Sequence, residues 1–392
     1  MIITLFGAYS GLGIYTAQYW GKKDIVNIRK VMGMAFTLGF ALAAFFTIGA
    51  TAFPSQIIGI FIKDAEVIKE GTRYLSIAAL TYIPVSISFV FSYTSRSVHL
   101  TKFPMAASIA ALSLNTFLNY LLINGNLGFP ELGVRGAAIA TLTARIVELF
   151  LLVLIIYKSK DHPLAGKLKE FFGYSLAMLK KVLKTAFPVI INESAWVVGV
   201  SVYFIAYGIL GTASIAAAQV SLTISDLIWA FLIGMGNATS VLIGNEIGAE
   251  RIDSAFNIAG RLVRMEFIAS IFLGLMYVLI GYNIAGFFGL SEETLAMALK
   301  CIYVNAAFIP IRMLGFVYIV GILRSGGDTK FCMFLDIGMV WMIGIPIAFI
   351  SVLVFKLPIY WAMVLINTEE VLKVLIAARR YRSRRWINVL IN

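Results

Sequence analysis

Acidic and basic side chains interrupt several long apolar stretches of this 392-residue chain. A charge inside an apolar helix is costly, so such residues are candidates for ion binding, proton transfer or a structural ion pair. The residues of this kind are Arg145, Glu148, Glu193, Asp226, Arg312, Asp336, Glu369 and Glu370. Carboxylates dominate the set, which favours the chemistry of cation and proton binding.

Glu193 lies in the segment FPVIINESAWVVG. It stands about ten residues into an apolar stretch, which places it roughly 15 Å deep on a helix. Pro188 can free a backbone carbonyl nearby, Asn192 adds an amide oxygen, and Trp196 lies one turn further on. Such a carboxylate can carry a proton, or bind Na⁺ with neighbouring oxygens. The sequence therefore predicts a cation site at Glu193 with Asn192 and Trp196 beside it; a glutamate that pairs with a helix neighbour is the alternative.

Two aspartates are further candidates for the same role. Asp336 lies in FLDIGMVWMIGIP, and it can pair with Arg312 only if the two helices are offset in depth. Asp226 lies in VSLTISDLIWAF, where three hydroxyl side chains are close enough in sequence to donate hydrogen bonds to it. These hydroxyls belong to Ser221, Thr223 and Ser225.

The spacing of the remaining charged residues predicts ion pairs within single helices. Glu369 and Lys373 are spaced i,i+4 and predict a helix-surface ion pair, which leaves Glu370 as the freer carboxylate and a candidate for cation coupling. Arg145 and Glu148 are spaced i,i+3 and predict a structural pair.

Amides are a second class of deep polar residue. Asn115 and Asn119 share one helix face because they are i,i+4. Amides in apolar surroundings usually bind a neighbouring helix. The functional hypothesis for Asn119 is that it lines a substrate cavity.

The elements that must position these residues are membrane-spanning helices. The chain is 60% hydrophobic and only 13% charged, and its mean hydropathy is +0.91. We expect an all-α polytopic membrane protein with eleven spans. These cover residues 1–20, 32–53, 72–95, 104–124, 136–157, 183–209, 215–245, 258–281, 299–322, 331–355 and 358–378.

The basic residues orient these spans. Most lysines and arginines fall in alternate connections and in the C-terminal tail, so the positive-inside rule places those connections and the C-terminus in the cytoplasm. The net charge of +12 then reflects anchoring at the anionic leaflet rather than a nucleic-acid partner. An odd number of spans would put the N-terminus outside. We therefore hypothesise a further helix before Met1.

Two copies of one pattern support that hypothesis. RSVHLTKF (96–103) and RSGGDTKF (324–331) match in register, and IGIFIKDAE (58–66) matches AGFFGLSEE (285–293) at nearly the same offset. Gly326-Gly327 can supply the positive φ that Val98-His99 must reach without glycine. The repeat predicts an N-terminal lobe of five spans (1–157), a cytoplasmic amphipathic linker (158–182) and a C-terminal lobe of six spans (183–392) with a basic tail, the lobes being parallel copies.

The order of these motifs resembles the multidrug and toxic compound extrusion (MATE) transporters. The resembling segments are QYWGKKD, GNEIGAER, NLGFPELGVRGAAIAT, GTASIAAAQVSL and GILRSGGDTKF. The resemblance implies a fold of twelve helices in two lobes, of which this chain would hold eleven, and an acidic residue in the helix that carries Glu193. It also implies efflux of organic cations by antiport with Na⁺ or H⁺ in the cell's inner membrane, with no cofactor beyond the coupling ion and a monomer as the working unit.

Two alternatives to efflux stay open at this point. A flippase for lipid-linked oligosaccharides belongs to the same superfamily, and fold alone does not separate the two. An intramembrane enzyme would need converging His, Cys or paired carboxylates. His99 and His162 instead lie in polar loops, and neither cysteine has a base at a suitable spacing, so we expect no enzymatic activity.

Overall fold

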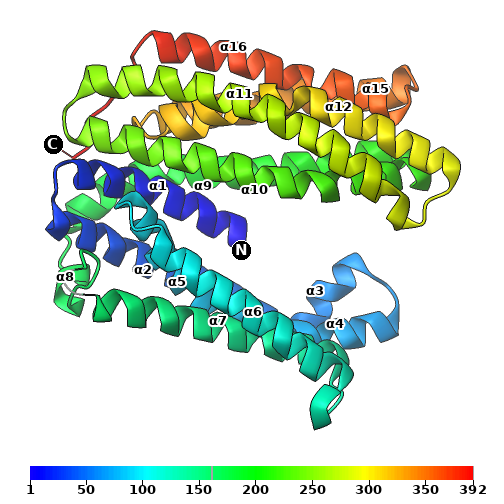
Figure 1. Cartoon of the computed structure of the whole chain (residues 1–392), viewed down its shortest axis with the longest axis horizontal. Helices are drawn as coiled ribbons and strands as arrows, with labels where there is room; N and C mark the ends of the chain where they lie inside the picture. Colours follow the sequence, from blue (N-terminus) through cyan, green and yellow to red (C-terminus); the bar gives the residue numbers. More distant parts are fainter. Residues whose placement is uncertain (160–161, 392) are drawn as a thin grey trace. The chain divides into compact units, whose positions relative to one another are not determined.

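The computed structural model describes residues 1–159 and 162–391. Helices make up almost all of this part of the chain, and it contains no strand. The helices form two compact units, Met1–Ala186 and Phe187–Asn392 (Figure 1).

The first unit begins with a hairpin of two long helices. Asp24 caps the second of these helices, because its carboxylate accepts a hydrogen bond from the N–H of Asn27 (3.0 Å). The elements of the unit are α1 (Ile2–Gly21), α2 (Ile25–Ala52), α3 (Pro54–Phe61), α4 (Ala65–Ala78), η1 (Ala79–Thr81), α5 (Tyr82–Ser97), α6 (Lys102–Asn124), η2 (Asn126–Gly128), α7 (Gly133–Lys158), α8 (Leu168–Phe172) and the beginning of α9 (Leu176–Ile209).

The second unit contains the rest of α9 and three π-helical segments, η4, η5 and η6. Such segments carry an extra residue per turn and are often found at functional sites. The elements are α10 (Thr212–Gly248), α11 (Ile252–Ile284), η3 (Ala285–Phe288), α12 (Glu292–Phe316), η4 (Val317–Leu323), α13 (Thr329–Gly338), η5 (Met339–Gly344), α14 (Ile345–Phe349), η6 (Ile350–Val354), α15 (Ile359–Ile366) and α16 (Thr368–Arg382).

Within the described ranges, nine helical stretches are long and apolar enough to cross a membrane. They are Ile25–Ala52, Ala65–Ser97, Lys102–Asn124, Gly133–Lys158, Leu176–Ile209, Thr212–Gly248, Ile252–Phe288, Glu292–Leu323 and Thr329–Val354. Each contains one of the predicted spans, apart from a residue or two at an end. The other two predicted spans coincide with α1 and with the α15–α16 pair, which Asn367 divides.

Left-handed backbone positions recur in the two units at the offset of the sequence repeat. Three pairs of residues with positive φ stand 227 or 228 positions apart. They are Lys23 (59°) with Glu250 (60°), His99 (62°) with Gly327 (82°), and Gly128 (84°) with Lys356 (49°). Most residues avoid this region, so chance is a poor explanation for three coincidences. The two units are copies of one backbone design, and His99 does adopt the conformation that Gly327 adopts freely.

The polar connection before α9 packs on α2. Its short helix α8 buries Phe171 (3% exposed), and Arg29 forms an ion pair with Glu170 at 2.8 Å. The N–H of Lys167 and the Arg29 guanidinium hold the pKa of the Glu170 carboxyl below its usual range. The predicted amphipathic helix is thus only five residues long, and its buried aromatic ring lies against a neighbouring helix.

Gly33 makes this close packing possible, and we predict opposite effects for two glycines of α2. A methyl group at Gly33 would fall on the carbonyl group of Phe171, whereas a methyl group at Gly49 meets nothing within 4 Å. Gly33→Ala should lower the free energy of unfolding by about 1–3 kcal/mol through overpacking. Gly49→Ala should raise it by about 0.5–1 kcal/mol, because alanine favours the helix. Thermal unfolding in detergent measures both, and equal midpoints would contradict the prediction.

Candidate functional site

A group of buried charged residues in the second unit is the candidate site. We call it the carboxylate cluster, and it contains Glu193, Asp336, Glu369, Glu370, Arg324 and Lys373. Its members come from α9, from the turn after η4, from α13 and from α16. Residues that are far apart in the sequence therefore meet inside one lobe.

Helix α9 contributes two adjacent polar residues that reach different partners. Neighbouring helical residues point about 100° apart. Glu193 accepts a hydrogen bond from the guanidinium of Arg324 at 2.6 Å, and Asn192 donates to the Asp336 carboxylate at 3.0 Å. The Arg324 side chain is 3% exposed and that of Glu193 is 15% exposed. The Glu193 carboxylate is thus neutralised by a buried arginine in this state.

Lys373 joins two other carboxylates of the cluster. Its ammonium lies 2.8 Å from Asp336 and 3.0 Å from Glu370. The sequence prediction of a Glu369–Lys373 pair is therefore wrong. The i,i+3 neighbour Glu370 makes this contact instead, because Asp336 on the facing helix draws Lys373 toward it.

Glu369 is satisfied by a hydroxyl group rather than by a cation. The phenol of Tyr203 donates to its carboxylate at 2.8 Å, and no ion pair of Glu369 occurs in the described part of the chain. The backbone passes close by at Gly344, where a methyl group would fall on both the Tyr203 hydroxyl and the Glu369 carboxylate. Gly344 therefore leaves the space in which this hydrogen bond forms.

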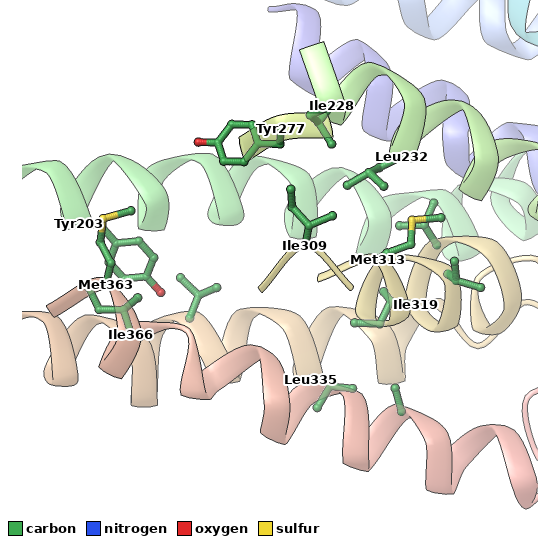
Figure 2. Close-up of a cluster of buried hydrophobic side chains, with 14 of the residues drawn as sticks. Tyr203, Ile228, Leu232, Tyr277, Ile309, Met313, Ile319, Leu335, Met363 and Ile366 are labelled. Atoms are coloured by element: carbon green, nitrogen blue, oxygen red, sulfur yellow. The ribbon is translucent and has the colours of Figure 1, made fainter. Parts of the chain in front are cut away.

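Apolar side chains surround this end of the cluster. Figure 2 shows Tyr203 close to Met363 and Ile366, with Ile309 and Met313 of α12 further along the core. A low-polarity surrounding strengthens hydrogen bonds and ion pairs, and it raises the cost of any charge left without a partner.

The cluster holds more negative than positive groups. Four carboxylates share two cations: Arg324 neutralises Glu193, and Lys373 is shared by Asp336 and Glu370. The Oδ1 atom of Asn192 is also buried, and it has no hydrogen-bond partner among the residues that the structure describes. The arrangement therefore offers anionic and neutral oxygens that an added cation or proton would satisfy.

Other predicted partners of the cluster lie elsewhere. Arg312 donates twice to the Asn367 amide oxygen, at 2.7 and 3.0 Å, so the possible Arg312–Asp336 pair does not form. Trp196 is partly buried against the hydrophobic core. Among the described residues, no three or more His, Cys, Asp or Glu side chains converge as metal ligands, so Na⁺ binding at Glu193 stays a prediction.

Asp226 is exposed on α10 and is not part of the cluster. The hydroxyl groups that could have bound it are engaged elsewhere. Thr223 donates to the Gln219 carbonyl and Ser225 to the Ser221 carbonyl, while the Ser221 hydroxyl binds Tyr277 and Asn305.

The predicted polar residues of the first unit form a separate chain of contacts. Asn119 donates to Asn115 at 3.2 Å, and Asn115 donates to Thr141 of α7 at 3.4 Å. The expected structural pair is confirmed, because Arg145 lies 2.7 Å from Glu148. The Asn115–Thr141 hydrogen bond joins α6 to α7, as amides in membrane helices often do, whereas the Arg145–Glu148 pair lies within α7.

Glu266 on α11 is a buried acid that the sequence reasoning missed. Its side chain is 1% exposed, Thr239 of α10 donates to Oε1, and Oε2 has no partner in the described part of the chain. The available signal was a single glutamate inside an apolar run. Its position two residues after Arg264 made it look like part of the polar end of that helix.

Lys373 should be the most sensitive basic residue of the cluster. Lys373→Met leaves Asp336 and Glu370 without their cation, so the free energy of unfolding should fall by about 3–5 kcal/mol. Lys330→Met, at an exposed lysine of α13, is the control and should leave stability unchanged. Adding Asp336→Asn to Lys373→Met should restore part of the loss. Additive losses in this double-mutant cycle, measured by thermal unfolding, would contradict the pairing.

Comparisons with known proteins place the chain among transporters. The family model described as MatE matches residues 1–121 and 188–350. The uncharacterised transporter YisQ of Bacillus subtilis is 26% identical over 99% of this chain and 85% of its own length. A probable multidrug resistance protein NorM of Thermotoga maritima is 23% identical over 97% of this chain and 85% of its own length.

Solved structures agree on the fold. A MATE protein in complex with MaL6 superposes with a TM-score of 0.84 at 17% identity, covering 98% of this chain and 87% of that one. A MOP superfamily transporter from Pyrococcus furiosus Vc1, whose reversed binding-pocket polarity suggests a different function for that protein, also reaches 0.84, at 17% identity over 98% and 86%.

Proposed function

Because this chain belongs to the MatE family of multi-pass membrane transporters, we propose that it is a secondary antiporter that exports organic cations in exchange for Na⁺ or H⁺. The family consists of transporters rather than enzymes. The single observation that supports cation coupling is the carboxylate cluster, in which four carboxylates share two cations inside one lobe.

The cluster suggests how binding of an ion could drive transport. In this state Arg324 forms an ion pair with Glu193, and Lys373 forms ion pairs with both Asp336 and Glu370. A proton or Na⁺ that binds must replace or supplement these cations, so it changes which side chains hold α9, α13 and α16 together. Its differential affinity for the two arrangements then shifts their populations, which is the requirement for coupling.

The working unit in this proposal is a monomer in the plasma membrane, with its C-terminus in the cytoplasm. The basic connections and tail support this orientation by the positive-inside rule. No resident cofactor is needed, because the coupling ion supplies the driving force. Drug-like compounds are the substrates, in line with the name multidrug resistance protein that the NorM relatives carry, and the excess of carboxylates favours cationic ones.

Two carboxylates should be essential for coupling. Glu193→Gln removes the charge that a coupling ion would share with Arg324, and Glu369→Gln removes the one carboxylate of the cluster that has no cation. Each should lower gradient-driven efflux at least about tenfold, equivalent to about 1.4 kcal/mol in the barrier. Glu292→Gln, at an exposed position of α12, is the control.

Proteoliposomes provide the measurement. A fluorescent cation is loaded, a Na⁺ gradient or a pH gradient is imposed separately without ATP, and efflux is followed while insertion of each variant is verified. Wild-type efflux in both Gln variants would remove the cluster from the mechanism. If the unaltered protein exports no cation but moves a lipid-linked oligosaccharide, the flippase alternative is established. The excess of carboxylates in the cluster argues against a flippase, because such lipids carry anionic phosphates.

A further inference from the structure

The segment after the last helix is docked on the second unit. We call residues 380–391, the end of α16 and the chain beyond it, the C-terminal strap. Its Trp386 is fully buried (0% exposed), and the indole N–H donates to the Tyr381 carbonyl at 3.0 Å. Arg384 lies 2.8 Å from Asp253 at the start of α11 and stacks over the Phe256 ring. A basic cytoplasmic tail was expected; a buried tryptophan within it was not.

The strap binds the turn RSGGDTKF at three consecutive residues. Both the backbone N–H and the side-chain amide of Asn388 donate to the Gly326 carbonyl, at 3.0 and 2.9 Å. Arg380 donates to the Asp328 carboxylate at 2.7 Å, and the Leu390 side chain lies beside Gly327. The outer side of the turn is therefore covered by the strap.

Gly326 has no side chain because the strap occupies that space. A methyl group there would fall on the carbonyl group and the ring of Trp386. The φ of Gly326 is not positive, so backbone conformation does not demand glycine at this position. Close approach of another chain segment is the remaining physical reason for it.

The inner side of the same turn carries Arg324. Its backbone N–H donates to the Ile319 carbonyl at 3.0 Å, which continues the π-helical pattern of η4. Its guanidinium forms the 2.6 Å ion pair with Glu193. A single residue, Ser325, thus separates the arginine that neutralises the cluster from the glycine that the strap holds.

The equivalent turn of the first unit has different residues at the positions that the strap contacts. In RSVHLTKF, Val98 and His99 replace the two glycines. The equivalent arginine, Arg96, is exposed, and its guanidinium lies over the Tyr93 ring at 5.4 Å. The same motif therefore presents a surface arginine in one copy and a buried counter-ion in the other.

We propose that the C-terminal strap positions Arg324 on Glu193 and thereby sets the affinity of the carboxylate cluster for the coupling cation. Only the second part of this inference, the effect on cation affinity, rests on the proposed function. Arg324 competes with an incoming cation for the Glu193 carboxylate, so a strap that holds the turn in place stabilises the cation-free state. Trp386, Asn388 and Arg380 are positioning residues that act through Arg324.

The test compares Trp386→Ala with three matched variants. Trp386→Phe keeps a ring against Gly326, and it should behave like the unaltered protein. Gly326→Ala attacks the same contact from the other side and should reproduce Trp386→Ala. Arg385→Ala changes an exposed residue of the strap, and it is the control.

Two readouts separate the halves of the proposal. Hydrogen exchange of the amides in residues 322–330 should accelerate in Trp386→Ala and Gly326→Ala and stay unchanged in Arg385→Ala. The Na⁺ or H⁺ concentration that gives half-maximal efflux should fall about fivefold, the lower end of typical coupling between two sites. Arg324→Lys already weakens the ion pair with Glu193, because lysine makes fewer hydrogen bonds to the carboxylate. Adding Trp386→Ala to Arg324→Lys should therefore change the half-maximal cation concentration little.

Each contrary result overturns a stated part of the proposal. Unchanged exchange in Trp386→Ala shows that the strap does not hold the turn. Faster exchange with an unchanged half-maximal cation concentration shows that the turn does not set affinity. A full additional fivefold effect in the Arg324→Lys background shows that the strap acts through another residue. Efflux in the unaltered protein that responds to neither cation refutes the proposed function, and the exchange result then stands alone.

Discussion

An ionised side chain that leaves water loses several kcal/mol of hydration free energy, so an apolar helix bundle can hold it only beside an opposite charge or strong hydrogen-bond donors. This constraint organises the second unit. Arg324 and Lys373 draw the turn after η4, α13 and α16 toward α9, because each cation must lie where carboxylates from other elements meet. The packing of these helices therefore depends on the ion pairs of the cluster.

The same constraint gives the cluster a property that an apolar core lacks. A core of apolar residues has one best packing, whereas shared cations can be redistributed when a proton or metal ion arrives. Lys373 already divides its charge between Asp336 and Glu370, and Glu369 accepts a hydrogen bond from the neutral Tyr203 hydroxyl. The strap adds mechanical support at the point where Arg324 leaves the membrane-spanning part of the chain.

Local patterns predicted the helices and the duplicated design. Long apolar runs suffice to place each span, and the repeated turn motif alone locates the equivalent left-handed positions His99 and Gly327. Glu193, Asn192 and Asp336 could be selected as candidates from the sequence, because a polar residue in an apolar run is visible without tertiary information, and the structure places all three in one cluster.

Partners across helices were not predictable in the same way. The Glu369–Lys373 spacing suggested a pair along α16, yet the facing Asp336 decides where the lysine points. Tyr203 and Trp386 look like ordinary aromatic residues in the sequence, since their roles depend on which segment packs against them. Glu266 was hidden by nearby arginines, because distance from a helix end in residues does not reveal burial by a neighbour.

The left-handed residues that the two units share keep the same backbone conformation where their side chains differ. Lys23 and Glu250 have opposite charges, yet their backbones differ by only one degree in φ. At these equivalent positions the side chains differ while the left-handed backbone conformation is the same, so both units bear its conformational cost. Torsion angles can therefore align the halves of such proteins at positions where the residue types differ.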